Sequence, residues 1–383
     1  MDFDLTEEQR LLKESIDRFA ADNARDPAQH GGSSAGAGDG AALWSGFAEL
    51  GLLALPFSEE DGGIGGGPVE TMIVMEAIGR TLITAPYLST VVLGGGFLRL
   101  GGTEAQRAEF IPQIADGSLK VAFAQLERQS RYDLYDIATT ARREGGDFVL
   151  DGRKGVVLGG DEAGLLVVTA RTAGSRRDHD GITLFLVDAS AAGVSRRGMP
   201  AQDGTRVAEI ALDGVRVPAE RVLGEVDAGL PLAGRVVDVA LAALCADSLG
   251  AMEELHRMTV DYLKQRQQFG VPIASFQALQ HRAADMLVAV EQARSMAIYA
   301  AMMAEEPDFR ERRPAIAAAK AQVNRSSRLV GQEAVQLHGG IAMTWEYKAG
   351  HYFKRLTAAE SLFGDTDHHL REVAEAGGLV EEI

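Results

Sequence analysis

The hydrophobic pattern of the chain changes twice, and these two changes limit the possible folds more than any other feature. Residues 1–118 carry apolar residues at helical spacing, and the pairs Thr6–Gln9 and Thr103–Gln106 fit capping boxes. Residues 119–225 carry short β-type runs between Gly/Asp turns, at 121–125, 148–150, 165–169, 182–187 and 207–212. Long helical runs then resume, at 232–268, 276–305 and 314–338. The pattern predicts a mainly α protein with a central β domain, divided into domains 1–118, 119–225 and 226–383.

The composition excludes several classes of partner and site. The 383 residues carry a formal net charge of -17, which repels polyanions, and we find no local basic stripe for nucleic acid. Cys245 is the only cysteine, which excludes an intrachain disulfide and a cysteine-rich zinc site, and its apolar neighbours predict a buried thiol. No window approaches the roughly 18 apolar residues of a spanning helix, and the first residues are acidic, unlike an export signal. We therefore expect a cytoplasmic protein with no membrane contact.

Three short segments in the last third of the chain combine glycine with charged or amide side chains. They are Arg-Gln-Gln-Phe-Gly at 266–270, Gln-Leu-His-Gly-Gly at 336–340 and Phe-Gly-Asp-Thr at 363–366. Each segment alone is compatible with an ordinary helix stop, C-terminal cap or turn. Together they offer groups suited to phosphate: Arg266 is a forked, permanently charged donor, and Gly339 with Gly340 lets backbone N–H groups approach an anion closely.

The order and spacing of these segments, within the helix–β–helix division, resemble the acyl-CoA dehydrogenase family over essentially the whole chain. The resemblance implies an N-terminal α-helical domain, a middle β-barrel domain and a C-terminal four-helix bundle. It also implies FAD as cofactor, an acyl-CoA substrate that is oxidised between its α and β carbons, and an electron-transferring flavoprotein as acceptor. The residues that match the family's FAD-binding elements, mostly for the FAD of a neighbouring subunit, are Arg266, Phe269, Gln336, Gly339, Gly340, Thr366 and His368.

Three further stretches are similar to one branch of the family. Residues 65–76, 127–133 and 347–356 resemble the small subunits of pimeloyl-CoA dehydrogenases. This closer resemblance implies a dicarboxyl-CoA substrate and a second, different dehydrogenase subunit as partner.

The catalytic base of the family has no counterpart at the expected positions. The usual glutamate corresponds to Gly364, and glycine cannot accept the α-proton of the substrate. Some relatives carry the base on the helix that here begins near residue 232, where the matching position is Ala240 and the adjacent arginine is Leu241. Two nearby carboxylates remain as substitutes: Asp365, displaced by one residue and shorter in reach, and the weaker candidate Asp238, expected to be solvated or paired.

The elements that face the flavin in the family are also altered. Leu126 stands where the family has the hydroxyl of a Thr-Glu-Pro-Gly element, and 156–159 read Val-Val-Leu-Gly in place of Trp-Ile-Thr-Asn. The elements for a neighbour's FAD are thus retained while those for the chain's own flavin are lost, which predicts a catalytically silent subunit of a heteromer. Two alternatives stay open: a complete homotetrameric dehydrogenase or oxidase with Asp365 as base, and a non-enzymatic scaffold that binds acyl-CoA or a partner without flavin.

Two other charged groups are interpreted as ordinary surface features. His368 and His369 are adjacent and are not expected to share one helical face with a carboxylate, so we predict no metal site there. The run from Arg310 to Arg313 is predicted to be an exposed loop before Pro314, because short mixed-charge clusters are usually solvated.

Overall fold

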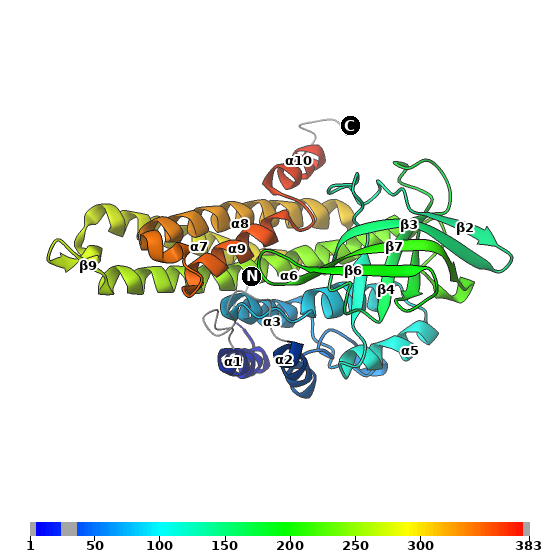
Figure 1. Ribbon diagram of the computed structural model, residues 1–383, viewed down its shortest axis with the longest axis horizontal. Coiled ribbons are helices and arrows are strands. Elements are labelled where there is room, and N and C mark those ends of the chain that lie inside the picture. The colour runs from blue at the N-terminus through cyan, green and yellow to red at the C-terminus, as the bar shows by residue number, and fades with distance from the viewer. Residues whose placement is uncertain (1–4, 24–36, 378–383) are drawn as a thin grey trace. The chain divides into compact units, whose positions relative to one another are not determined.

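Two sets of elements pack separately in the computed structural model, which describes residues 5–23 and 37–377 (Figure 1). The first unit contains α1, α3, most of α6 and all later elements, and the second contains residues 38–67 and 84–240. The predicted domain 1–118 is therefore shared between both units. The predicted boundaries at 118 and 225 stay a prediction about sequence domains, because the packing units cut across them.

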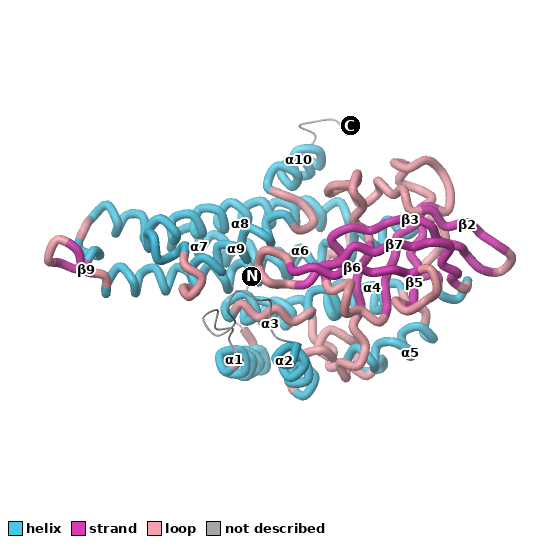
Figure 2. Tube along the Cα trace, in the orientation of Figure 1, coloured by secondary structure: helices cyan, strands magenta, loops and turns pink. Residues whose placement is uncertain are grey.

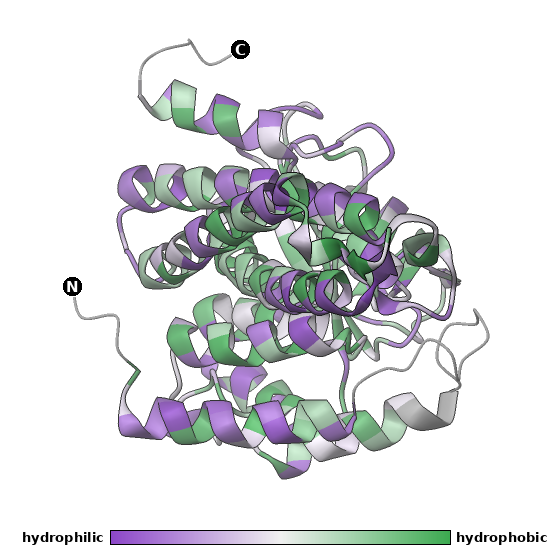
Figure 3. Cartoon of the chain, turned by 90° about the vertical axis from the view of Figure 1, so that its left-hand side faces the viewer, coloured by the Kyte–Doolittle hydropathy of each residue, from purple (hydrophilic) through white to green (hydrophobic). Residues whose placement is uncertain are grey.

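The first unit is a bundle of long helices. α7 packs along α8, α8 contacts α9 and α10, and α3 contacts α1 and α7. Figure 3 shows hydrophobic and hydrophilic residues on the same helices, as expected of helices with one buried side. The elements are α1 (Glu7–Asp22), α3 (Pro68–Thr81), α6 (Gly229–Gln265), the hairpin β9 (Gln267–Gln268) and β10 (Val271–Pro272), α7 (Gln277–Met303), α8 (Phe309–His338), α9 (Lys348–Ser361) and α10 (Thr366–Ala376).

α3 and α6 cross with their backbones in contact. A methyl group on Gly79 would lie 1.8 Å from the carbonyl oxygen of Asp247, and one on Gly250 would lie 1.9 Å from that of Glu76. Only glycine permits such a crossing at either position. Beside it, the Arg80 guanidinium contacts Asp17 Oδ1 at 2.7 Å and Glu253 Oε2 at 2.9 Å, which ties α3 to α1 and α6.

The second unit is built on an eight-stranded mixed sheet (Figure 2). The strand order is β6-β7-β3-β2-β4-β5-β8, and β1 pairs in parallel with β4. Its inward side chains form an apolar cluster that includes Leu150, Val168 and Phe185, each fully buried. The strands are β1 (Val121–Ala124), β2 (Thr140–Glu144), β3 (Asp147–Leu158), β4 (Leu165–Arg171), β5 (Ile182–Asp188), β6 (Val194–Pro200), β7 (Arg206–Val217) and β8 (Val222–Leu223), and the unit's helices include α2 (Ala37–Glu49), α4 (Gly96–Gly101) and α5 (Glu104–Ala115).

The predicted fold class is confirmed, and so are most local signals. Both capping boxes form, at Thr6 and at Thr103, and each predicted β run coincides with a strand, except that the run 121–125 extends one residue beyond β1. Cys245 is buried, and burial raises the pKa of its thiol to about 12. The strands that were not predicted are β2, β6 and the two-residue strands β8, β9 and β10. β2 carries mostly exposed charged residues, and β6 is almost wholly exposed, so neither has the apolar alternation that marks a strand.

One helix contradicts the expectation that no segment is apolar enough to span a membrane. α6 contains an 18-residue window of mean hydropathy 1.6, which passes that test by length and composition. However, 67% of the window is buried inside the protein. The core helix of a folded bundle has the same signature, so the apolar surface of α6 is explained by packing.

Candidate cofactor and active site

Two of the three motif segments meet at one end of the helical bundle. The hairpin at 266–272 follows α6, and the Gly-Gly turn follows α8. The rings of Tyr262, one turn before Arg266, and His338, just before Gly339, are in contact in a tilted arrangement, with 4.7 Å between their centroids. This contact places the hairpin and the turn side by side.

The predicted FAD-binding residues at this end are all open to solvent. Arg266, Gln336, Gly339 and Gly340 are exposed, and Phe269 is 91% exposed with a positive φ of 55°. A side chain on either glycine would meet no atom within 4 Å. No described part of this chain covers the turn, so its backbone is accessible to a ligand that another molecule presents.

The third motif segment differs from the other two: Asp365 and Thr366 line a surface pocket, but the glycine does not. Gly364 is buried, with φ at 131°, a conformation that L residues rarely adopt. A methyl group there would lie 2.6 Å from His368 Cδ2 and 2.6 Å from His369 Nε2. The segment therefore has no room for a glutamate at the position of the family base.

Asp365, the predicted substitute base, serves as the N-cap of α10. Its Oδ1 accepts a hydrogen bond of 2.9 Å from the backbone N–H of His368, and Thr366 is the first residue of the helix. The cap gives the carboxylate a structural role. The second candidate, Asp238, was expected to be solvated or paired; it is fully buried and has an interaction partner, which fits the paired alternative. Ala240, the matching position on α6, is buried.

A buried polar cluster behind Gly364 was missed by the sequence interpretation. His369 Nδ1 lies 3.1 Å from Glu372 Oε2, and the Arg313 guanidinium binds Glu372 Oε1 through Nε at 3.0 Å and also through Nη2. Burial lowers the pKa of His369 to about 4, so the imidazole is neutral at pH 7. The pKa of Glu372 falls to about 2, because His369 and Arg313 favour its carboxylate more than burial disfavours it.

This cluster corrects two expectations. The adjacent histidines do share a face with a carboxylate: ligand atoms of His368, His369 and Glu372 lie within 4.8 Å of one another. The neighbouring Arg313 guanidinium already neutralises Glu372, and it opposes a cation among these ligands. Residues 310–313 are not an exposed loop, because α8 begins at Phe309 with Asp308 as its N-cap, and Arg312 is buried.

On the second unit, the strands that would face a flavin carry apolar side chains. Leu126 follows β1, and its carbonyl accepts a 2.8 Å hydrogen bond from Gly155 N–H at a bulge in β3. Val156, at this bulge, is 54% exposed and has φ at 47°, which is strained for a β-branched residue. Neither Leu126, Val156 nor Leu158 has a side-chain hydrogen-bonding group, so this surface cannot reproduce the family's contacts to the flavin ring.

Directly beneath this surface lies an intact buried ion pair. Lys154 Nζ is 2.7 Å from Glu127 Oε1 and 2.9 Å from Thr169 Oγ1, and it also donates to the Gln125 carbonyl at 3.3 Å. Burial lowers the pKa of Lys154 to about 8, partly offset by Glu127. Lys154 lowers the pKa of Glu127 to about 2, against the effect of burial. The pair joins β3 to the segment that follows β1, which gives it a structural role in the sheet.

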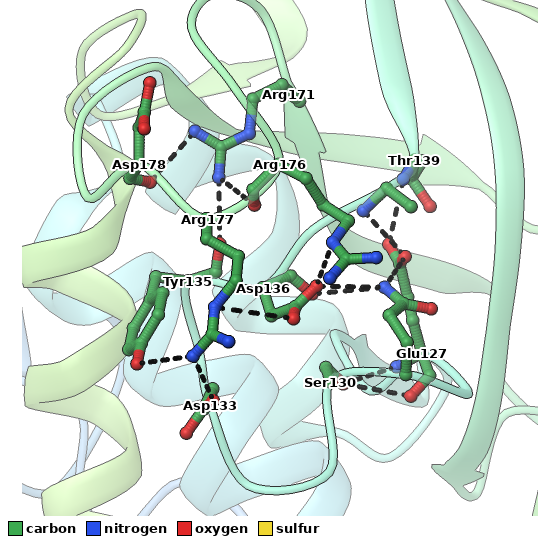
Figure 4. A network of polar contacts seen from close by, with 12 residues as sticks. Glu127, Ser130, Asp133, Tyr135, Asp136, Thr139, Arg171, Arg176, Arg177 and Asp178 are labelled. Carbon is green, nitrogen blue, oxygen red and sulfur yellow. Dashed lines mark hydrogen bonds and ion pairs between the residues drawn. The ribbon is translucent and has the colours of Figure 1, made fainter. Parts of the chain in front are cut away.

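The loop that replaces the family's glycine-rich element is held by ion pairs (Figure 4). Arg176 Nε lies 3.0 Å from Asp136 Oδ1, and Arg177 Nη2 lies 3.4 Å from Asp133 Oδ2. Arg171 donates to four backbone carbonyl oxygens of the two loops, at 2.7 to 3.0 Å. The loop after β1 is therefore fastened to the β4–β5 hairpin, by arginines that lie about 40 residues further along the sequence.

Comparison with known proteins agrees with this architecture. The acyl-CoA dehydrogenase N-terminal, middle and C-terminal domain profiles match residues 6–118, 122–215 and 227–378. The chain belongs to the acyl-CoA dehydrogenase family. It is an oxidoreductase by family, and FAD and acyl-CoA are the cofactor and substrate class to which the fold corresponds.

Three relatives illustrate the range of this similarity. Acyl-CoA dehydrogenase FadE12 of Mycobacterium tuberculosis is 34% identical over 313 residues, covering 80% of this chain and 79% of the relative. The caffeyl-CoA reductase–Etf complex subunit CarC of Acetobacterium woodii is 30% identical over 319 residues, covering 80% and 82%. A solved structure described as a Tcur3481-Tcur3483 steroid ACAD variant superposes with a TM-score of 0.87 at 28% identity, covering 97% and 98%.

The residues of this chain fit FAD only in part. The open end of the bundle supplies Arg266 and a glycine turn that suit a pyrophosphate. The apolar residues Leu126 and Val156, and the buried Gly364, do not suit a flavin ring or its chemistry. The contrast between these two sets of residues could be predicted from the motifs in the sequence. The cluster around Glu372 and the ion pairs that hold the loop after β1 could be found only in the structure.

Proposed function

We propose that this chain is the catalytically silent subunit of a heteromeric acyl-CoA dehydrogenase. Its partner would carry a complete active site and hold FAD, and this chain would complete the binding site of that FAD. The observation that carries the proposal is the contrast between an exposed set of groups suited to phosphate around Arg266 and a buried glycine, Gly364, at the position of the family's base.

In this role the chain binds and positions but does not transfer protons. FAD supplies the acceptor for the hydride when it is bound. Arg266 would neutralise the pyrophosphate with its guanidinium, and the exposed turn at Gly339 and Gly340 would let backbone groups approach it without obstruction. The exposed Phe269 would add apolar contact area. None of these groups can remove the α-proton of an acyl thioester.

The proposed substrate rests on the sequence resemblance, and the proposed acceptor rests on the name of a relative. The resemblance of 127–133 and 347–356 to small subunits of pimeloyl-CoA dehydrogenases favours a dicarboxyl-CoA as substrate. The name of CarC links a relative to an Etf complex, which supports an electron-transferring flavoprotein as acceptor. The steroid ACAD carries two component names, which supports a two-chain enzyme and makes a steroid acyl-CoA a second substrate to assay.

The decisive experiment compares the chain alone with the chain co-produced with a dehydrogenase-like partner. The proposal expects bound flavin and dye-linked oxidation of pimeloyl-CoA only in the mixture. Flavin and turnover in the single chain would instead establish a complete enzyme, with Asp365 as the first base to test. A mixture without flavin would leave a non-enzymatic scaffold.

A further inference from the structure

We propose that His368 and His369 occupy the space that any side chain at position 364 would need, so that this chain is kept silent by packing as well as by a missing carboxylate. The inference rests on the proposed silent role. It predicts that replacing Gly364 with glutamate does not restore a catalytic base, although glycine-to-glutamate is the single change that separates this position from the family's.

The first argument is the geometry around Gly364. The glycine is buried, and the direction that a Cβ would take leads into both imidazole rings, with His368 Cδ2 and His369 Nε2 each at 2.6 Å and His369 Cε1 at 2.9 Å. Such distances are shorter than side-chain atoms tolerate, so both rings would have to move. His369 is fully buried and has little room to do so.

The second argument is that His369 is fixed from behind. Because an ionised carboxylate can only accept, His369 Nδ1 carries the hydrogen that it shares with Glu372 Oε2 at 3.1 Å. Glu372 is in turn held by Arg313 from α8. The imidazole is thus oriented by a carboxylate and a guanidinium from two helices, as a metal ligand or catalytic histidine is oriented by its neighbours.

The third argument is the remaining ring nitrogen. His369 Nε2 faces Gly364, and it has no hydrogen-bond partner among the described residues. A buried, unpaired acceptor opposes folding, so this arrangement is kept at a cost in stability. The space beside the Gly364 Cα is therefore occupied by the neutral imidazole of His369, and there is no void into which a carboxylate side chain could be introduced.

A double-mutant cycle tests the packing directly. Gly364→Ala is made in the wild-type chain and in a His368→Ala/His369→Ala background, and the midpoint of thermal unfolding is measured. The cost of the unusual backbone conformation is present in both backgrounds and cancels. We expect Gly364→Ala to lower the midpoint by roughly 5 °C in the wild type and by less than half as much in the double-alanine background.

Gly145→Ala is the matched control, because Gly145 also has a positive φ, of 63°, but no atom within 4 Å of a built Cβ. If Gly364→Ala shifts the midpoint no more than Gly145→Ala, or shifts it equally in both backgrounds, the packing inference is overturned. If Gly364→Glu fails to fold in the wild type but folds in the double-alanine background, the inference is supported.

The functional arm separates this inference from the proposed function. Gly364→Glu, assayed alone with pimeloyl-CoA and an artificial electron acceptor, is expected to show no turnover. Turnover by the Gly364→Glu chain alone would overturn the inference. Turnover by the wild-type chain alone would instead overturn the silent role, while the unfolding cycle would still decide the packing.

Discussion

The open end of the bundle and the segment at Gly364 carry neighbouring motifs of the same family pattern, yet they have opposite physical character. Around Arg266 and Gly339 the side chains are exposed and the glycines face free space. Around Gly364 the glycine is buried and faces two imidazole rings. The comparison teaches that motifs of one family pattern can differ in accessibility within one chain: the groups around Arg266 and Gly339 face solvent, while Gly364 is enclosed by side chains.

The largest expected effect concerns the scaffold beneath the altered flavin surface. Glu127→Gln leaves Lys154 buried without its carboxylate, and we expect a loss of about 3 kcal/mol in the free energy of unfolding. Urea unfolding followed by circular dichroism measures it. Glu209→Gln is the control, since its pair with Arg197 is exposed and should contribute less than about 1 kcal/mol. Equal effects for the two variants would show that the Lys154 pair has no special role in this unit.

The cluster of His369 and Glu372 next to Gly364 should make the free energy of unfolding depend on pH. The pKa of His369 is about 4 in the folded chain, against an ordinary value of 6.5, so the unfolded chain binds more protons between these values. Stability should fall as the pH drops, by about 2 kcal/mol between pH 7 and pH 5. The pKa of Glu372 is lowered in the folded chain, so its protonation adds to this loss of stability only when the pH falls below the ordinary value of 4.5.

His369→Asn is the comparison for this pH dependence, because it keeps a donor for Glu372 and removes the titrating ring. Unfolding free energies at pH 5, 6 and 7 should fall less steeply toward pH 5 in the variant than in the wild type. Parallel pH profiles for the two proteins would show that His369 is not buried in its neutral form.

At the open end, Arg266→Ala should weaken flavin retention by the heteromer. Loss of a charge-assisted hydrogen bond to phosphate corresponds to roughly a ten- to hundredfold rise in the FAD concentration needed for half saturation. Arg257→Ala is a matched control, because this arginine is also on α6 but is paired on the helix surface with Glu254 and Asp261. An Arg266→Ala heteromer with unchanged FAD affinity would remove the main support for a shared cofactor site.

The smallest expected effect is on the strained bulge of β3. Val156→Gly relieves a β-branched residue with positive φ and should stabilise the chain by about 1 kcal/mol, measured by urea unfolding. Val194→Gly, in the ordinary strand β6, should have the opposite sign. A destabilised Val156→Gly variant would indicate that the valine packs against something at this surface.

How far the sequence predicts this protein depends on how local the signal is. Capping boxes at Thr6 and Thr103 and the apolar strands around Val168 were predictable because a few adjacent residues determine them. β6 was not predictable, because its side chains are exposed and it is held as a strand by backbone pairing with β7. The contact of Arg313 with Glu372 joins residues far apart in the chain, and only the packing of α10 against α8 brings them together.

The glycine at the motif position of the family's base could be read from the sequence, but the crowding around it could not. The crowding there depends on the rotamers of His368 and His369, which follow the turn into α10. The candidate Asp365 was proposed from its proximity in sequence, whereas the structure uses it as a helix cap.

The flavin stoichiometry of the purified two-chain complex tests the central claim most directly. FAD is released by denaturation, its absorbance is measured, and the amount is divided by the amount of each chain. We predict one FAD for each partner chain and none for this chain, so one FAD per pair. Two FAD molecules per pair, or FAD retained by this chain alone, would contradict it.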